Sequence, residues 1–560
     1  MSKPLTEGRM KGGNGAVKEQ ADNKLTPIKP PPSPESRALP MDEFEQLDLT
    51  AAQEDYAVFL PALSGFYATY VGKQQAGEYV PYTRVPFANG MESINWLNKD
   101  KAMFPYKWAL YSAGHANLDI TKEVPKEDMI RKRDRANTFV LGDSGGFQVA
   151  KGKWPGDWRA NSGCPAAAKK RKEVLTWLDE YMDYGMVLDI PTWVVRDKVA
   201  QEACKITTYQ GAVDATRFNN DYFMANRKGY KNGGCKLLNV LQGSSHEEAD
   251  DWYEQVKEYC DPTVYPDTHF NGWSMGGQNM CDVHLILSRI VDLHFDGLLQ
   301  EGIHDWMHFL GTSRLEYALI LTDIQRAVRK NYNPNFTISF DCASPFLATA
   351  NGRIYTHCSM EDREKWSYSM AFSLDNKKYS QDTRKLRDAM LQDKWFERFD
   401  YSPVLDSVLA KDVCIYGPGD LNKIGKEGAT SWDSFSYTVQ MTHNVWKHIE
   451  TVQEANRRYD AGLSPKMLVQ EAFDRVYCRE VIEMIFSCDN REDAQAIINH
   501  YTKFWMQIVG SRGFAGKKAE NPSTQFNKLF TIVHPAAEDA AEIEQDDEEA
   551  LDTLEHTLDE

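Results

Sequence analysis

The chain has 560 residues, of which 42% are hydrophobic and 12% aromatic, and its formal net charge is −18. This length allows one large domain with additions, or two or three domains. No stretch approaches the roughly 18 apolar residues of a membrane helix, and the N-terminus lacks the apolar run of a signal peptide. Residues 538–560 hold 12 acids and no Lys or Arg, which leaves −6 for the remainder. The net charge therefore neither supports nor excludes a polyanionic partner.

The ten cysteines are spread singly, with no C-x-C or C-x-x-C pair. Such spacing is typical of reduced, mostly buried thiols rather than of a disulfide framework. We therefore expect a cytoplasmic protein (in the host cytoplasm, if a phage encodes it) that does not associate with membranes.

Composition divides the chain into five segments. Residues 1–40 hold seven of the 24 prolines together with scattered lysines, which is typical of a disordered, slightly basic arm. Helical spacing of apolar residues returns near the C-terminal end, where the helices either pack on the preceding domain or form a domain of their own. The expected segments are an arm (1–45), a barrel (46–356), a charged insertion (357–437), packed helices (438–525) and an acidic tail (526–560).

Eight short apolar runs follow the arm, and most are spaced to allow an intervening helix. This alternation predicts an α/β protein with a parallel (β/α)₈ barrel, the TIM barrel. An open doubly wound sheet is the competing interpretation, although no G-x-G-x-x-G follows the first run. The expected strands are 58–63, 108–112, 138–142, 186–190, 237–241, 269–273, 307–311 and 337–340.

Acids, an amide and glycines gather where these expected strands end. The run 139–142 leads into Asp143, and Asp189, Gln242 and Asp341 end later runs. Active sites of barrels lie at the C-terminal ends of the strands, so we expect a polar cup with at least two facing carboxylates. Paired carboxylates at an anomeric carbon permit displacement through a covalent intermediate. An amide and a third acid can read the edge of a purine-like base, although the residues alone do not select a base over a sugar.

The motifs at the strand ends resemble, in order and over residues 138–356, those of the tRNA-guanine transglycosylase family. Residues 138–148 are similar to the family's D-S-G-G-F-Q strand end, and 186–189 to its base-recognising aspartate strand. Residues 240–243 resemble its V-Q-G strand, and 272–276 its G-L-A-V-G turn. Residues 309–311, followed by 340–342 and Pro345, are similar to the strands around its nucleophile.

The resemblance implies roles for individual residues. Asp341 would be the nucleophile that attacks C1′ of a nucleoside, and Asp143 the general acid and base. Ser144, Asp189, Gln242 and the backbone at Gly272 would hold the base. The whole expected base-binding set is Ser144, Gly145, Gly146, Gln148, Asp189, Gln242, Gly243, Gly272 and Trp273. No cofactor is expected.

The sequence departs from the tRNA enzymes at two places. Their zinc is held by a C-x-C-x-x-C cluster and a later histidine; His443 resembles that histidine in context, but the cysteine cluster is absent. We therefore expect no metal. Aligned without gaps, Leu347 and Ala350 stand where the family carries arginines that contact tRNA.

These departures favour the DNA-modifying branch of the family, which exchanges guanine in DNA for a 7-deazaguanine such as preQ0. The expected partners are DNA and the free base. The open alternatives are a transglycosylase acting on tRNA and a non-catalytic subunit that only binds nucleic acid. Two basic runs beside the Asp143 loop are candidate phosphate contacts: Arg131, Lys132 and Arg133, and Lys169, Lys170, Arg171 and Lys172.

Overall fold

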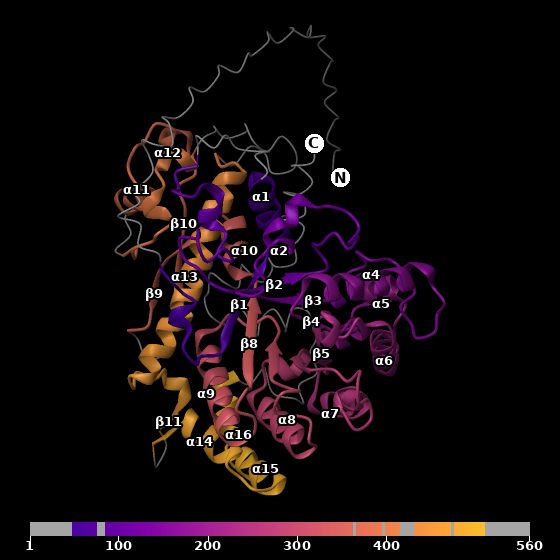
Figure 1. Cartoon of the computed structure of the whole chain (residues 1–560). Helices are drawn as coiled ribbons and strands as arrows, with labels where there is room; N and C mark the ends of the chain where they lie inside the picture. The colour runs from indigo at the N-terminus through magenta and orange to yellow at the C-terminus, as the bar shows by residue number, and fades with distance from the viewer. Residues whose placement is uncertain are drawn as a thin grey trace, which may run out of the picture.

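The computed structural model describes residues 47–75, 85–361, 366–394, 398–414, 431–471 and 475–509. Eight parallel strands close into a barrel in chain order, because β8 pairs with β1. The TIM-barrel prediction is confirmed, and the open doubly wound sheet is excluded (Figure 1). The strands are β1 (Val58–Leu63), β2 (Trp108–Ser112), β3 (Phe139–Asp143), β4 (Tyr184–Met186), β5 (Lys236–Leu241), β6 (Gly272–Met275), β7 (Trp306–Phe309) and β8 (Thr337–Cys342).

The strand boundaries agree closely with the expected ones except at β4 and β6. β1 and β2 begin and end at the expected residues. β4 begins two residues before the expected run, because Tyr184 and Gly185 already pair with β5. β6 begins three residues later than expected. The N–H of Phe270 donates to the carbonyl of Tyr259 and the N–H of Asn271 to that of Leu237, and pairing with β7 begins only at Gly272. The shift at β6 moves Gly272 from the expected C-terminal end of a strand to its first residue.

Helices alternate with the strands and cover the outside of the barrel (Figure 1). Several begin at an Asp, Ser or Thr whose side chain accepts from the first free backbone N–H groups; Asp282 before α8 and Asp433 before α13 are examples. The barrel helices are α1 (Gly65–Gln75), α2 (Asp128–Arg131), α3 (Gly146–Ala150), α4 (Pro165–Tyr181), α5 (Lys198–Cys204), α6 (Tyr209–Asn226), α7 (His246–Val256), α8 (Val283–Phe295), α9 (Leu315–Asn331) and α10 (Ser344–Ala350).

Aromatic side chains fill the barrel near the N-terminal ends of the strands. Phe139 of β3 stacks on Trp306 of β7 with 4.2 Å between ring centroids, and Tyr184 of β4 lies 5.4 Å from the same indole. β3 and β4 are neighbours and β7 lies across the barrel from them, so these rings close its lower end. A ligand can therefore enter the interior only from the C-terminal ends of the strands.

The chain after the barrel adds a hairpin and further helices. The 27-residue α13 packs on α9, α10 and the hairpin, and the three helices that follow it pack on α8 and α9 (Figure 1). The hairpin begins inside the segment expected to be barrel, before residue 357. The expected arm (1–45) and acidic tail (526–560) lie outside the described residues. The added elements are β9 (Arg353–Ser359), β10 (Ser367–Phe372), α11 (Leu386–Lys394), α12 (Ala410–Val413), α13 (Ser434–Asp460), β11 (Val469–Gln470), β12 (Val476–Tyr477), α14 (Cys478–Phe486), α15 (Arg491–His500) and α16 (Thr502–Val509).

Two general expectations from composition can be compared with this part of the chain. All ten cysteines are free, and eight of them are buried. Among the helices that the structure describes, none has the length and apolar character needed to cross a membrane.

Candidate active site

A cavity of about 440 Å³ opens at the C-terminal ends of the strands. Strand ends and the loops after them contribute its walls, so residues far apart in the sequence meet there. The cavity brings together six of the residues expected from the sequence, from β3, α3, β8 and the loops that follow β4 and β5: Asp143, Gly146, Gln148, Asp189, Gln242 and Asp341.

Asp143 is the last residue of β3, and its carboxyl group is held by two donors. Ser112, the last residue of β2, donates from Oγ to Oδ2 at 2.6 Å, and the backbone N–H of Gly145 donates to Oδ1 at 3.3 Å. Burial raises the pKa of Asp143 above its ordinary value, the two hydrogen bonds oppose this, and the nearby Asp341 raises it further. A carboxyl group that keeps its proton more readily than usual suits a general acid.

Asp341 near the end of β8 faces the same cavity. The backbone N–H of Gly311 donates to its Oδ1 at 2.8 Å, and the N–H of Thr312 donates to its backbone carbonyl at 2.7 Å. Nε2 of the buried His308 lies 3.2 Å from the same Oδ1. The carboxylate is therefore held through Oδ1 by the N–H of Gly311, in the turn after β7, and Nε2 of His308 in β7 faces the same oxygen.

Asp189 and Gln242 form a pair on the floor of the cavity. Nε2 of Gln242 donates to Oδ2 of Asp189 at 2.7 Å, and both side chains are buried. Burial raises the pKa of Asp189 to about 7, against the effect of the Gln242 hydrogen bond, and Asp143 contributes in the same direction as burial. A Cβ on Gly146 would lie only 2.6 Å from the backbone oxygen of Asp189, so this close approach requires glycine.

The raised pKa of Asp189 predicts a specific dependence of stability on pH. Between pH 3.8 and about 7 the folded protein holds a proton at Asp189 that the unfolded chain has lost, so stability falls as the pH rises through this window. Asn cannot ionise. We expect Asp189→Asn to gain about 2 kcal/mol relative to the parent protein between pH 5 and pH 8. Urea unfolding at the two pH values measures this, and an equal difference at both values would contradict it.

Three expected base-binding residues shape the loops instead of lining the cavity. Ser144 is buried and donates from Oγ to the carbonyl of Val187 at 3.0 Å. Gly145 adopts φ +84°, and Gly243 adopts φ +127° while its carbonyl accepts from the N–H of Gln278. These backbone conformations favour glycine and set the direction of the neighbouring Asp143 and Gln242.

The structure contradicts the expected roles of Gly272 and Trp273. Gly272 begins β6 and so lies at the opposite end of the strand from the cavity. Trp273 is fully buried and donates from Nε1 to the carbonyl of Leu298 at 3.0 Å, on the outer side of the sheet among the covering helices. The turn after β6 does reach the cavity, but through Gly276 and Gly277. The error follows from placing β6 three residues too early.

The position of Trp273 predicts that its loss affects stability and not base recognition. In Trp273→Phe the carbonyl of Leu298 loses its donor and the ring leaves unfilled space, so we expect a loss of about 1–3 kcal/mol in the free energy of unfolding. The affinity of the cavity for its ligand should stay within twofold of the parent value, because Trp273 does not line it. A large loss of affinity with unchanged stability would restore the expected role of Trp273 in binding.

The two basic runs are only partly available to a nucleic acid. Arg131 is paired with Glu127, and Arg133 with Asp183 at 2.8 Å; both guanidinium groups are buried. Arg171 is buried and donates to Asn219. The three arginines are therefore structural, which corrects the expectation for them. The exposed members are Lys132, Lys169 and Lys172, with Lys170 partly buried, and for these phosphate contact stays a prediction.

His443 in α13 is not free to bind a metal. Its Nε2 lies 2.7 Å from the carbonyl of Tyr355, and its Nδ1 lies 2.8 Å from Oγ of Ser402. Burial lowers the pKa of His443 to about 3, so the ring is neutral, donates through Nε2 and accepts at Nδ1. Across the described ranges no group of three or more His, Cys, Asp or Glu side chains could hold a metal ion. The residues present do not fit the zinc of the resembling family.

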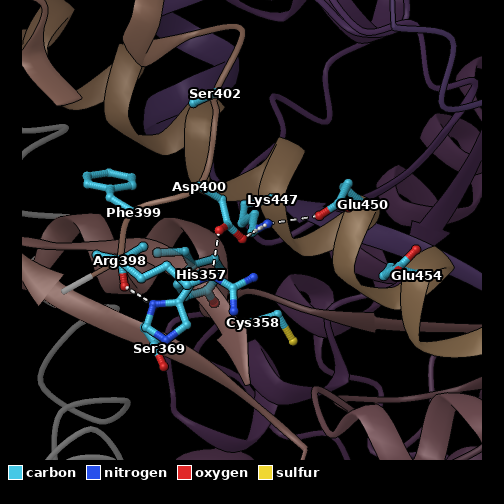
Figure 2. A network of polar contacts seen from close by, with 12 residues as sticks. His357, Cys358, Ser369, Arg398, Phe399, Asp400, Ser402, Lys447, Glu450 and Glu454 are labelled. Atoms are coloured by element: carbon cyan, nitrogen blue, oxygen red, sulfur yellow. Dashed lines mark hydrogen bonds and ion pairs between the residues drawn. The ribbon is translucent and has the colours of Figure 1, made fainter. Parts of the chain in front are cut away.

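One turn after His443, α13 contributes Lys447 to an ion-pair network. Figure 2 shows Lys447 of α13 between two acids, with Nζ 3.0 Å from Asp400 Oδ2 and 3.0 Å from Glu450 Oε2. Arg398 also reaches Asp400, at 2.8 Å from its Nε. Lys447 is largely buried, so its charge depends on these partners. The network joins the segment 398–414 to α13.

Several cavity residues were not found from the sequence. Ser112 ends a strand that was correctly placed, so its position alone could have indicated it. Phe147 is 39% exposed and lies with Lys151 and Trp193 at the cavity, with the lysine 5.5 Å from each ring centroid. Phe147 belongs to the D-S-G-G-F-Q motif, which could have indicated it, whereas nothing in the spacing of Lys151 and Trp193 separates them from ordinary loop residues. His308 does not line the cavity but lies 3.2 Å from Asp341, which does. It stands inside an apolar run, and a polar residue there was the available signal.

No protein-family model and no curated protein sequence matches this chain. The barrel topology rests on the structure. What the site does must therefore be inferred from its chemistry and from the resemblance of its strand-end motifs.

Proposed function

We propose that this barrel is a base-exchange transglycosylase that replaces guanine in DNA with a 7-deazaguanine such as preQ0. The observation that carries the proposal is the meeting of two carboxyl groups, Asp143 and Asp341, in one cavity beside the Asp189–Gln242 pair. The resemblance to the tRNA-guanine transglycosylase family implies that Asp341 is the nucleophile and Asp143 the general acid and base.

In the first half-reaction the carboxylate of Asp341 attacks C1′ of the target nucleotide. The bond between C1′ and N9 breaks, its electron pair leaves with guanine, and the proton of Asp143 neutralises the departing base. The product is an ester between Asp341 and the sugar. The raised pKa of Asp143 supports this role, because the group must hold a proton when the bond breaks.

The second half-reaction reverses these steps with a different base. The incoming 7-deazaguanine loses its N9 proton to Asp143, and N9 attacks C1′ while the ester electron pair returns to Asp341. Guanine must leave before the new base enters the same pocket, so the kinetics are ping-pong. The Asp189 and Gln242 side chains offer both acceptor and donor atoms to the edge of a purine-like base.

The target nucleotide must leave the base stack to reach this cavity. The choice of DNA over tRNA depends on α10, which follows the nucleophile strand. Leu347 lines the cavity mouth, and Leu347 and Ala350 occupy the places where the tRNA enzymes of the resembling family carry arginines. A substrate held through those arginines therefore lacks its contacts here.

Labelled guanine incubated with the protein and either duplex DNA or tRNA tests the proposal. We expect label to enter DNA and not tRNA, and unlabelled preQ0 to release it again. Incorporation into tRNA alone would replace the proposal with the tRNA alternative. Binding of nucleic acid with no incorporation into either would favour a non-catalytic subunit, which has no need of Asp143 and Asp341.

A further inference from the structure

A column of polar side chains rises through the barrel interior to the proposed nucleophile. Trp306 and His308 are two residues apart on β7, and Ser339 and Asp341 are two residues apart on β8. His308 and Ser339 are direct neighbours in the register of the two strands. Side chains two residues apart point to the same face of a strand, and Trp306 packs inside the barrel. His308 and Ser339 have no exposure to solvent.

The hydrogen bonds in this column fix which ring nitrogen of His308 carries a proton. The indole Nε1 of Trp306 can only donate, and it lies 2.8 Å from Oγ of Ser339. Ser339 has one proton to give, and Nδ1 of His308 lies 2.9 Å from it. The arrangement that satisfies every donor runs from Trp306 to Ser339 to Nδ1. The proton of the neutral ring is therefore on Nε2.

The Nε2–H group of His308 faces the carboxylate of Asp341. It is buried and makes no well-aligned hydrogen bond, and Oδ1 of Asp341 lies 3.2 Å away. An N–H left without an acceptor in a protein interior is costly, so the carboxylate is its natural partner. Gly311 already donates to the same Oδ1 at 2.8 Å. Oδ2 of Asp341 takes no hydrogen bond from any residue in the described part of the chain.

We propose that His308, set by Ser339 and Trp306, is a positioning residue that holds Oδ1 of Asp341 and leaves Oδ2 as the atom that bonds to C1′. The inference rests on the proposed function. With one oxygen restrained, the free oxygen is aimed at the sugar before reaction. The same N–H stabilises the charge that returns to Asp341 when the ester breaks, so both half-reactions depend on it.

Four variants of the full chain test this role. His308→Leu removes the donor, and His308→Gln keeps an N–H at about the same reach. Ser339→Ala frees the ring to change its protonated nitrogen without touching the cavity. His304→Gln is the matched control, because His304 is equally buried but bonds to the carbonyl of Cys260. Measurements are the single-turnover rate of guanine release from DNA, the KM for the free base, and the unfolding temperature.

We expect His308→Leu to slow guanine release about 100-fold with the KM for the free base within twofold, and His308→Gln to recover the rate to within about tenfold. Ser339→Ala should slow release about tenfold, and adding it to His308→Leu should cost nothing further. His304→Gln should lower the unfolding temperature and leave the rate unchanged.

Equal rates in folded His308→Leu and the parent protein would overturn the inference, and so would equal defects in the Leu and Gln variants. If His308→Leu does not fold, the rate of Ser339→Ala decides, since a purely structural histidine predicts unchanged release in this variant and the proposal predicts release about tenfold slower. Absence of release and exchange in the parent protein would instead reject the proposed function, and this inference with it.

Discussion

Replacing Asp341 with Ala is expected to reduce base exchange by roughly 10⁴-fold or more, because no other group can form the ester on which both half-reactions depend. Asp341→Asn should be equally inactive, since an amide keeps the shape of the side chain but is a poor nucleophile. Initial rates of labelled guanine incorporation into duplex DNA measure the effect.

Asp323→Asn is the matched control for Asp341. Asp323 is a buried acid whose carboxylate accepts from Tyr459 in the added helices, away from the cavity. We expect this variant to change stability while keeping the exchange rate per folded molecule. Exchange that survives in Asp341→Ala would show that another group, or water, attacks C1′.

Replacing Asp143 with Asn is expected to slow guanine exchange by roughly 10²–10⁴-fold, because the base then leaves without a proton. The defect should depend on the leaving base. A 7-methylguanine in the DNA already carries a positive charge and departs as a neutral molecule. Asp143→Asn should therefore release 7-methylguanine at nearly the parent rate while it releases guanine slowly.

The release of 7-methylguanine therefore distinguishes the role of Asp143 from that of Asp341. Asp341→Ala should fail with both guanine and 7-methylguanine, because the nucleophile is needed whatever the charge of the leaving base. Ser112→Ala, which removes the 2.6 Å hydrogen bond to Asp143, should show a smaller form of the Asp143 defect. If 7-methylguanine does not rescue Asp143→Asn, Asp143 acts by holding the base or the sugar and not by proton transfer.

The barrel could be predicted from the sequence because each strand is short, apolar and followed by a polar turn. β1 and β2 were placed to the residue, and the acids that end β3 and lie in β8 were correctly expected at the C-terminal ends. The pattern of apolar residues, however, does not show at which residue pairing with the neighbouring strand begins. At β6 the apolar run began before the ladder did, and this single displacement put Gly272 and Trp273 on the wrong end and the wrong face.

Features that depend on packing between distant segments could not be predicted in the same way. A run of basic residues looks alike whether its side chains are exposed or buried, and only the fold shows that the side chains of Arg133 and Arg171 are buried. The column from Trp306 to Asp341 depends on the register of β7 against β8, and this register cannot be predicted from the sequence. The same holds for Lys447, whose acidic partner Asp400 lies 47 residues away.

The central claim is that Asp341 forms a covalent bond with the sugar of a DNA nucleotide as guanine leaves. The most direct test is to denature the protein rapidly after mixing it with guanine-containing duplex DNA but no free base, digest both components, and measure the peptides by mass spectrometry. We expect a deoxyribosyl adduct on the peptide that contains Asp341, and its disappearance when preQ0 is added before denaturation. Guanine release with no adduct on that peptide, or an adduct formed only with tRNA, would contradict it.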